Sequence, residues 1–363
     1  MKYSLILIGE ALLGDEPMLG YIGRHLAACG IRPEKTFKYR RAESLFADVA
    51  PASEAEAVFI LSEPEQAALI AREIATHTED SIAMRDDRLL PSRAVLLDKA
   101  YYKVVGAQRD IHVMTVRSGA GLPEPDLRER SSETQLIHLF DVEKSAVAPA
   151  LKHLAETYRI KHALSEPVPG WLQCRMECER FGDIEGAAQQ LAAQFPTAIR
   201  AENIALWLIE SLEQSGRTVT FAESCTGGLL SYYLTKQSGA SNVFEGALVT
   251  YSNRLKSAWI AVENSTLQAH GAVSREVVEE MSSGAMDVSG ADYAIAVSGI
   301  AGPTGGTPQK PVGTVHVCVR SREKQETVQL QLNGDRNYIQ EQTVLHAVKM
   351  LMLLDKKTFF KIL

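Results

Sequence analysis

The residues that could most clearly take part in a reaction are Ser224, Cys225 and Thr226, which follow a β-prone run and precede two glycines. A strand that ends in small polar residues and passes into a helix aims a hydroxyl and several backbone N–H groups at one point. Such a loop suits acyl transfer or anion binding. The alternative is that Ser224 or Thr226 only caps the helix predicted over 229–237, where apolar residues recur at helical spacing.

A possible base follows one segment later. Tyr251, Asn253 and Lys256 lie close together, and no histidine is near them in the sequence. A serine nucleophile would then need a lysine whose pKa is depressed, or a tyrosine that relays the proton. The ordinary lysine pKa of about 10.4 would have to fall to roughly 7–8 through burial or a neighbouring cation. The alternative is a solvated Lys256 on an amphipathic helix.

Two later segments could bind a ligand. Ser298, Gly299 and Gly302 follow an apolar run that indicates a buried parallel strand, and ligands in open α/β sheets bind beyond the carboxyl ends of strands. Arg336 follows Asp335, the expected N-cap of the last long helix. An arginine in a first turn is unfavourable for the helix dipole, so a phosphate is its natural ligand; the alternative is an exposed surface arginine.

Together these segments resemble the C-terminal (PncC) domain of the CinA family in order and spacing. The motifs that carry the resemblance are Ala222-Glu223-Ser224-Cys225-Thr226-Gly227-Gly228, Val249-Thr250-Tyr251-Ser252-Asn253 with Lys256, His270-Gly271-Ala272-Val273-Ser274, Ser298-Gly299-Ile300-Ala301-Gly302-Pro303, Lys310-Pro311-Val312-Gly313-Thr314-Val315 and Gly334-Asp335-Arg336. The resemblance implies an amidohydrolase that converts the carboxamide of nicotinamide mononucleotide to nicotinate mononucleotide and ammonia. That reaction serves NAD salvage and uses neither a metal nor a cofactor.

The resemblance also implies roles for individual residues. Ser224 would be the nucleophile and Lys256 its base, with Tyr251 passing the proton or orienting Lys256. Backbone N–H groups of Cys225–Gly228 would form the oxyanion hole. The substrate-binding residues would be Thr226, Gly227, Gly228, Asn253, Ser298, Gly299, Gly302 and Arg336. Cys225 is the rival nucleophile, because a thiolate is intrinsically the stronger one.

The first 165 residues alternate strands and helices, which is typical of a parallel α/β domain. Leu7-Ile8-Gly9-Glu10-Ala11-Leu12-Leu13-Gly14 is similar to the start of the molybdopterin-binding-like (MoaB/MogA-like) domain that precedes the amidohydrolase in full-length CinA proteins. That family expects Gly-Gly-Leu-Gly-Pro-Thr and then aspartates after the next strand, whereas this chain has Ser62-Glu63-Pro64-Glu65-Gln66. The sequence therefore predicts a degenerate domain without the phosphate cradle or the acidic metal ligands.

The middle of the chain is expected to join two larger domains. Glu166-Pro167-Val168-Pro169-Gly170 is interpreted as a hinge, followed by a strand over 171–180 and a helix over 184–195. We therefore expect an α/β protein of three parts: a parallel-sheet domain at 1–165, a small α/β connector at 166–200 and an α/β/α amidohydrolase domain at 201–363. Cys174 and Cys178 alternate with polar residues, which indicates core positions rather than a metal site.

Composition narrows the class of protein. The net charge of −7 argues against a general nucleic-acid binder, which needs clustered Lys and Arg. No apolar run approaches the ~20 residues of a membrane span, so a cytoplasmic protein without a membrane partner is expected. We expect a homo-oligomer that binds a small-molecule pyridine nucleotide. Two alternatives are a catalytically degenerate regulatory scaffold that binds nucleotides, and an ADP-ribose pyrophosphatase in the N-terminal domain.

Overall fold

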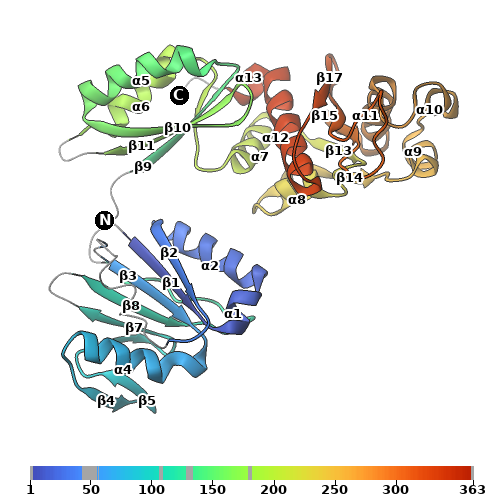
Figure 1. The fold of residues 1–363 in the computed structure, drawn as a ribbon. Coiled ribbons are helices and arrows are strands. Elements are labelled where there is room, and N and C mark those ends of the chain that lie inside the picture. The colour runs from blue at the N-terminus through green and yellow to red at the C-terminus, as the bar shows by residue number, and fades with distance from the viewer. Residues whose placement is uncertain are drawn as a thin grey trace. The chain divides into compact units, whose positions relative to one another are not determined.

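The computed structural model describes residues 3–42, 55, 57–105, 109–127, 134–178 and 182–360. The chain forms two compact units, Met1–Ser132 and Glu133–Leu363, in place of the three parts expected (Figure 1). None of the helices in the described ranges is both long and apolar enough to span a bilayer.

The first unit is built on a six-stranded sheet in the order β2-β1-β3-β8-β7-β6, with a separate β4-β5 hairpin. Its elements are β1 (Tyr3–Ile8), α1 (Glu10–Gly14), α2 (Glu16–Ala28), β2 (Pro33–Tyr39), β3 (Ala57–Ser62), the 3₁₀ turn η1 (Pro64–Gln66), α4 (Ala67–His77), β4 (Ile82–Arg85), β5 (Arg88–Pro91), β6 (Val95–Asp98), β7 (Tyr101–Val105) and β8 (Asp110–Thr115). Strands β2, β1, β3 and β8 run parallel, and α2 and α4 cover opposite faces (Figure 1). Every residue of β1 and β3 is buried, as parallel strands covered on both faces require. The predicted α/β class is confirmed.

The segments that follow β1 and β3 contact each other at the carboxyl ends of these strands. The Glu63 carboxylate accepts a hydrogen bond from Leu12 N at 2.6 Å. Gly9 has a φ of +135°, a backbone conformation that L side chains rarely adopt, and a Cβ atom there would also lie 2.3 Å from Glu63 Cδ, so glycine is favoured at this position. Glu63 therefore lies beyond the strand ends, where ligands of open α/β sheets bind; the degeneracy of this domain stays a prediction. The likeness to the molybdopterin-binding-like family stays a prediction.

The second unit carries two sheets (Figure 1). Its elements are β9 (Thr134–Phe140), α5 (Lys144–Tyr158), β10 (Ile160–Val168), β11 (Trp171–Cys178), α6 (Ile184–Gln194), β12 (Ala198–Arg200), α7 (Ile204–Ser215), β13 (Val219–Glu223), α8 (Leu229–Thr235), the 3₁₀ turn η2 (Ala240–Asn242), β14 (Phe244–Val249), α9 (Asn253–Ile260), α10 (Asn264–His270), α11 (Arg275–Ser289), β15 (Tyr293–Gly299), β16 (Thr314–Ser321), β17 (Gln325–Gln331), α12 (Arg336–Leu354) and α13 (Lys356–Phe359).

The first of these sheets is larger than the predicted connector. Its strand order is β10-β11-β9-β12, and the element order βαββαβ is that of a ferredoxin-like fold. The boundary expected after residue 165 is therefore wrong, because β9, α5 and β10 belong to the same sheet as β11 and β12. Strand β10 is mostly exposed and gave no apolar pattern in the sequence. Cys174 lies in the core under α5 and α6, as predicted, whereas Cys178 is half-buried at its edge; the last two residues of the strand predicted over 171–180 lie outside the described residues.

The expected hinge at 166–170 is instead the end of β10 together with the tight turn at Pro169 and Gly170 that leads into β11. Val168 and Trp171 are 1 % and 2 % exposed and belong to the hydrophobic core of the C-terminal sheet, together with Phe140. Two side chains of α12, Gln342 and Lys349, donate hydrogen bonds to carbonyl groups of this segment. The two parts of the second unit therefore share one core and are not joined by a flexible linker.

This shared core predicts that a fragment of residues 133–363 is more stable than one of residues 201–363. The shorter fragment loses Phe140, Val168 and Trp171 from its core, and burying an apolar side chain of this size contributes about 1.5–3 kcal/mol. We expect its free energy of unfolding in urea to be lower by at least about 3 kcal/mol. Equal midpoints and slopes for the two fragments would contradict the shared core.

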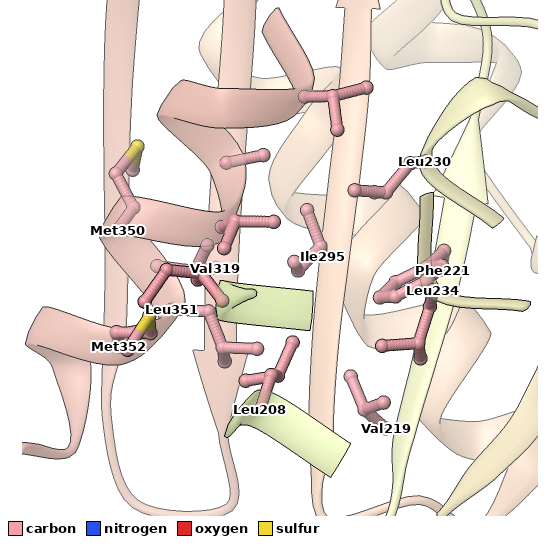
Figure 2. Packing of buried hydrophobic residues seen from close by; sticks show 14 of the residues in the cluster. Leu208, Val219, Phe221, Leu230, Leu234, Ile295, Val319, Met350, Leu351 and Met352 are labelled. Atoms are coloured by element: carbon pink, nitrogen blue, oxygen red, sulfur yellow. The ribbon is translucent and has the colours of Figure 1, made fainter. Parts of the chain in front are cut away.

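The C-terminal sheet holds the site described below. Its order is β14-β13-β15-β16-β17, with β14, β13 and β15 parallel and β16 and β17 antiparallel. Helices α7, α8 and α12 cover one face; Figure 2 shows Leu351 of α12 and Leu230 of α8 on either side of Ile295 of β15. Helices α9 and α11 cover the other face. The expected α/β/α arrangement is confirmed.

Candidate active site

A cavity of about 210 Å³ lies where β13, β14 and β15 end. Because parallel strands end at the same edge of a sheet, the residues that follow them come together there. The cavity is lined by Ser224, Cys225, Tyr251, Asn253, Lys256, Ala272, Val273, Ser298, Gly299, Ala301 and Arg336. Seven of the eleven predicted site residues line it. The other four, Thr226, Gly227, Gly228 and Gly302, do not.

Ser224 and Lys256 face each other across this cavity. Lys256 Nζ lies 2.9 Å from Ser224 Oγ and 2.7 Å from the carbonyl oxygen of Thr250. Ser252 caps α9 by accepting a hydrogen bond from Leu255 N, and this cap fixes the helix face that carries Lys256. Lys256 is 1 % exposed, so the alternative of a solvated lysine is wrong.

Burial sets the protonation state of Lys256. Desolvation disfavours the ammonium form and lowers the pKa of Lys256 to about 8. A neutral amine can donate to Thr250 O and use its lone pair to accept the proton of Ser224 Oγ. This geometry suits a serine nucleophile with a lysine base. The Thr250 contribution is a backbone carbonyl, so no side-chain pattern could have predicted it.

Cys225 is poorly placed as the rival nucleophile. Its side chain packs in the core between the sheet and α8, where burial raises the pKa of its thiol to about 12. At neutral pH the thiolate, which is the reactive form, is scarcely populated. Its carbonyl accepts a hydrogen bond from Gln340 Nε2 at 2.6 Å, one helical turn beyond Arg336 on α12.

Neither Ser224 nor Thr226 caps α8. The N-cap residue is Gly228, which has no side chain, and Ser224 Oγ instead faces Lys256. The cap comes from Glu223, whose carboxylate accepts hydrogen bonds from the N–H groups of Gly228, Leu230 and Ser231. Thr226 also donates its hydroxyl hydrogen to Glu223, not to the cavity. No pattern in the sequence indicates this capping role of Glu223.

Two of the four N–H groups predicted for the oxyanion hole already donate hydrogen bonds within the protein. Gly227 N donates to Ser224 O at 3.1 Å, and Gly228 N donates to Glu223 Oε2 at 3.0 Å. Within the described residues, the N–H groups of Cys225 and Thr226 donate to no other residue. Of the N–H groups predicted for the oxyanion hole, these two are therefore the candidates that remain.

Arg336 and Tyr251 form a bridge at the cavity. Arg336 Nη1 donates to Gly302 O and Nη2 donates to Tyr251 Oη, both at 2.9 Å. Asp335 caps α12 as predicted, by accepting from Tyr338 N at 2.8 Å. The Tyr251 hydroxyl is thus bonded to Arg336 and not to Lys256; the carbonyl of Thr250 contacts the Lys256 amine instead.

Three hydrogen bonds hold the opposite wall of the cavity. Ser298 Oγ donates to Ala272 O at 2.8 Å, so its hydroxyl supports the cavity wall. Lys310 Nζ donates to the carbonyls of His270 and Val273, both at 2.7 Å. Residues of two loops that are distant in sequence are thereby fixed against each other.

The C-terminal part of the chain is similar to known proteins. Residues 201–354 match the family described as CinA C-terminal domain. The CinA-like protein of Thermosipho melanesiensis is 45 % identical over 175 residues, which is 48 % of this chain and 43 % of that protein. The CinA-like protein of Thermotoga maritima is 44 % identical over 142 residues, which is 39 % of this chain and 35 % of that protein. The chain thus spans less than half the length of the curated relatives that it matches.

Solved structures are also similar to part of this chain. The competence/damage inducible protein CihA from Agrobacterium tumefaciens is 39 % identical; the match covers 42 % of this chain and 93 % of that chain, with a TM-score of 0.41. The competence-damaged protein (CinA) superfamily protein from Enterobacter cloacae is 33 % identical, with 42 % of this chain and 90 % of that chain covered and a TM-score of 0.41.

Proposed function

Since this chain belongs to the CinA family, we propose that its C-terminal domain hydrolyses the carboxamide of nicotinamide mononucleotide to nicotinate mononucleotide and ammonia, a step of NAD salvage. The observation that carries the proposal is the 2.9 Å contact between Lys256 Nζ and Ser224 Oγ, two buried groups in one cavity. Arg336 in the same cavity offers a cation for the phosphate of the mononucleotide.

The groups in the cavity can account for each bond and each proton transfer of this hydrolysis. Ser224 Oγ attacks the amide carbon while its proton passes to the Lys256 amine, and the carbonyl oxygen becomes an oxyanion next to the Cys225 and Thr226 N–H groups. The C–N bond then breaks, and the proton on Lys256 leaves with the nitrogen as ammonia. Water attacks the acyl ester with Lys256 again as base, which restores Ser224 and releases the carboxylic acid. The pyridinium ring of the substrate is a cation, so it favours the neutral form of Lys256.

The direct test is ammonia release by the full chain from nicotinamide mononucleotide, with nicotinate mononucleotide identified as the second product. Stoichiometric appearance of both products supports the proposal. Binding of the mononucleotide without release of ammonia would favour the alternative of a non-hydrolytic nucleotide-binding scaffold. Cleavage of ADP-ribose by the same preparation would instead assign activity to the N-terminal unit.

Arg336→Ala is expected to impair use of the mononucleotide far more than use of the riboside, which lacks the phosphate. Loss of one charge-assisted hydrogen bond costs about 1.5–3 kcal/mol, or roughly 10- to 100-fold in kcat/KM for the mononucleotide. Arg322→Ala is a matched control, because Arg322 is exposed and pairs with Asp292 away from the cavity. Steady-state kinetics on both substrates give the comparison.

Equal losses on the two substrates would give Arg336 a different role. The residue also bridges Gly302 and Tyr251, so its removal could loosen the cavity wall for any substrate. The ratio of the two kcat/KM losses separates phosphate binding from that structural effect.

A further inference from the structure

Glu223 is a fully buried carboxylate next to Ser224, and the mechanism above does not use it. It is the last residue of β13 and is 0 % exposed. Its Oε2 accepts hydrogen bonds from Thr226 Oγ1 at 2.7 Å, Gly228 N at 3.0 Å and Leu230 N at 3.1 Å. Its Oε1 accepts from Ser231 N at 2.9 Å and from the Ser231 hydroxyl.

Three of the five partners are backbone N–H groups, which can only donate, and together they engage both oxygens of the side chain. This donor set suits a carboxylate, because a protonated acid would lose acceptor capacity on one oxygen. Within the described part of the chain, Glu223 takes part in no ion pair. A buried charge without a counterion is costly unless hydrogen bonds satisfy it. The N–H groups and the dipole at the start of α8 supply that stabilisation.

Glu223 accepts more hydrogen bonds than an ordinary helix cap does. A serine or aspartate cap satisfies one or two N–H groups, whereas Glu223 binds three N–H groups and two hydroxyls. Glu223 precedes the turn at 224–228, and four of its five bonds go to residues at or beyond the end of that turn. One carboxylate therefore ties the strand before the turn to the helix after it.

We propose that Glu223 is a positioning residue for the proposed amide hydrolysis, on which this inference rests. By tying β13 to α8, the carboxylate fixes the turn from which Ser224 Oγ meets Lys256 Nζ at 2.9 Å. It also occupies the Gly228 N–H group, which leaves the Cys225 and Thr226 N–H groups for the oxyanion. Glu223 acts through the turn and does not touch the substrate.

The test is Glu223→Gln, which keeps the shape of the side chain but turns one acceptor into a donor. Either orientation of the amide sets an NH₂ group against the N–H of Ser231 or against those of Gly228 and Leu230. We expect kcat for ammonia release to fall about 100-fold, the loss typical when an oxyanion donor is displaced. KM should stay within about threefold of the wild-type value, because ground-state binding is untouched.

A matched control is Asp183→Asn, the same chemical change at the N-cap of α6, where Asp183 Oδ1 accepts from Gly186 N at 2.8 Å. This variant should leave kcat unchanged, because the asparagine oxygen still accepts from Gly186 N and α6 lies outside the cavity. A second readout uses a fluorophosphonate, which labels an activated serine without the nucleotide; mass spectrometry gives the rate at Ser224. We expect labelling in Glu223→Gln to slow about 100-fold as well.

The two readouts separate the two proposals. If the wild type releases no ammonia but Glu223→Gln still slows labelling of Ser224, the proposed function fails and the positioning role stands. Rates of release and labelling within about threefold of wild type, or losses that only match the fraction unfolded by circular dichroism, would overturn the positioning role. If Glu223→Gln does not fold, Thr226→Val and Ser231→Ala each remove one donor, and unchanged labelling in both would overturn it equally.

Discussion

Ser224→Ala is expected to reduce ammonia release from nicotinamide mononucleotide by at least about 10⁴-fold, because loss of the nucleophile in a serine hydrolase removes most of the catalysed rate. The substitution takes away one oxygen that contacts Lys256 and leaves the hydrogen bonds of Glu223 in place. We therefore expect little change in stability or in the binding of the mononucleotide. Single-turnover kinetics and calorimetric titration with the same substrate measure the two effects separately.

Cys225→Ala is the natural control for this prediction. Cys225 packs in the core and its thiol pKa is raised to about 12, so its removal should leave most of the activity and cost about 1 kcal/mol of stability through the cavity that it creates. An inactive Cys225→Ala beside an active Ser224→Ala would invert the assignment of the nucleophile.

Local patterns in the sequence predicted the C-terminal domain well. The strand and helices around Ser224, Lys256 and Arg336 carry apolar residues at clear helical or strand spacing, and the Asp335 cap lies where the sequence indicated. Parallel strands end at one edge, so residues that follow β13, β14 and β15 had to come together. Most of the predicted site residues therefore line one cavity.

Interactions made by the backbone, or by pairs of residues that are distant in the chain, leave no pattern in the sequence. The Thr250 carbonyl that contacts Lys256 has no side-chain signature. Glu223 looked like one more polar residue, because its five donors are brought to it only by the turn and the helix that follow. The proline-rich segment Pro167–Pro169 resembles a linker in the sequence. Val168 and Trp171 are nevertheless buried, because a sheet and a helix from much later in the chain pack against them.

Lys256→Met is expected to abolish ammonia release, and Lys256→Arg to fail as badly, because a guanidinium does not give up its proton near neutral pH. The wild-type rate should rise with pH through an apparent pKa near or below about 8, since only the neutral amine can take the proton of Ser224. A rate that stays flat between about pH 5 and pH 9, on both sides of the lowered pKa, would argue against lysine as the base.

The same burial makes a prediction about the stability of the wild type, which should rise with pH as the activity does. The pKa of Lys256 falls from 10.5 to about 8 on folding, so between these values the unfolded chain binds the extra proton and the free energy of unfolding of the wild type rises with pH. Below about pH 8 the full penalty of about 3 kcal/mol applies. Lys256→Met carries no such penalty. Its stability relative to the wild type, measured by urea unfolding, should therefore decrease by about 3 kcal/mol between pH 7 and pH 10.5. A difference that does not change with pH would mean that Lys256 stays charged in the folded protein, and a charged Lys256 could not serve as the base.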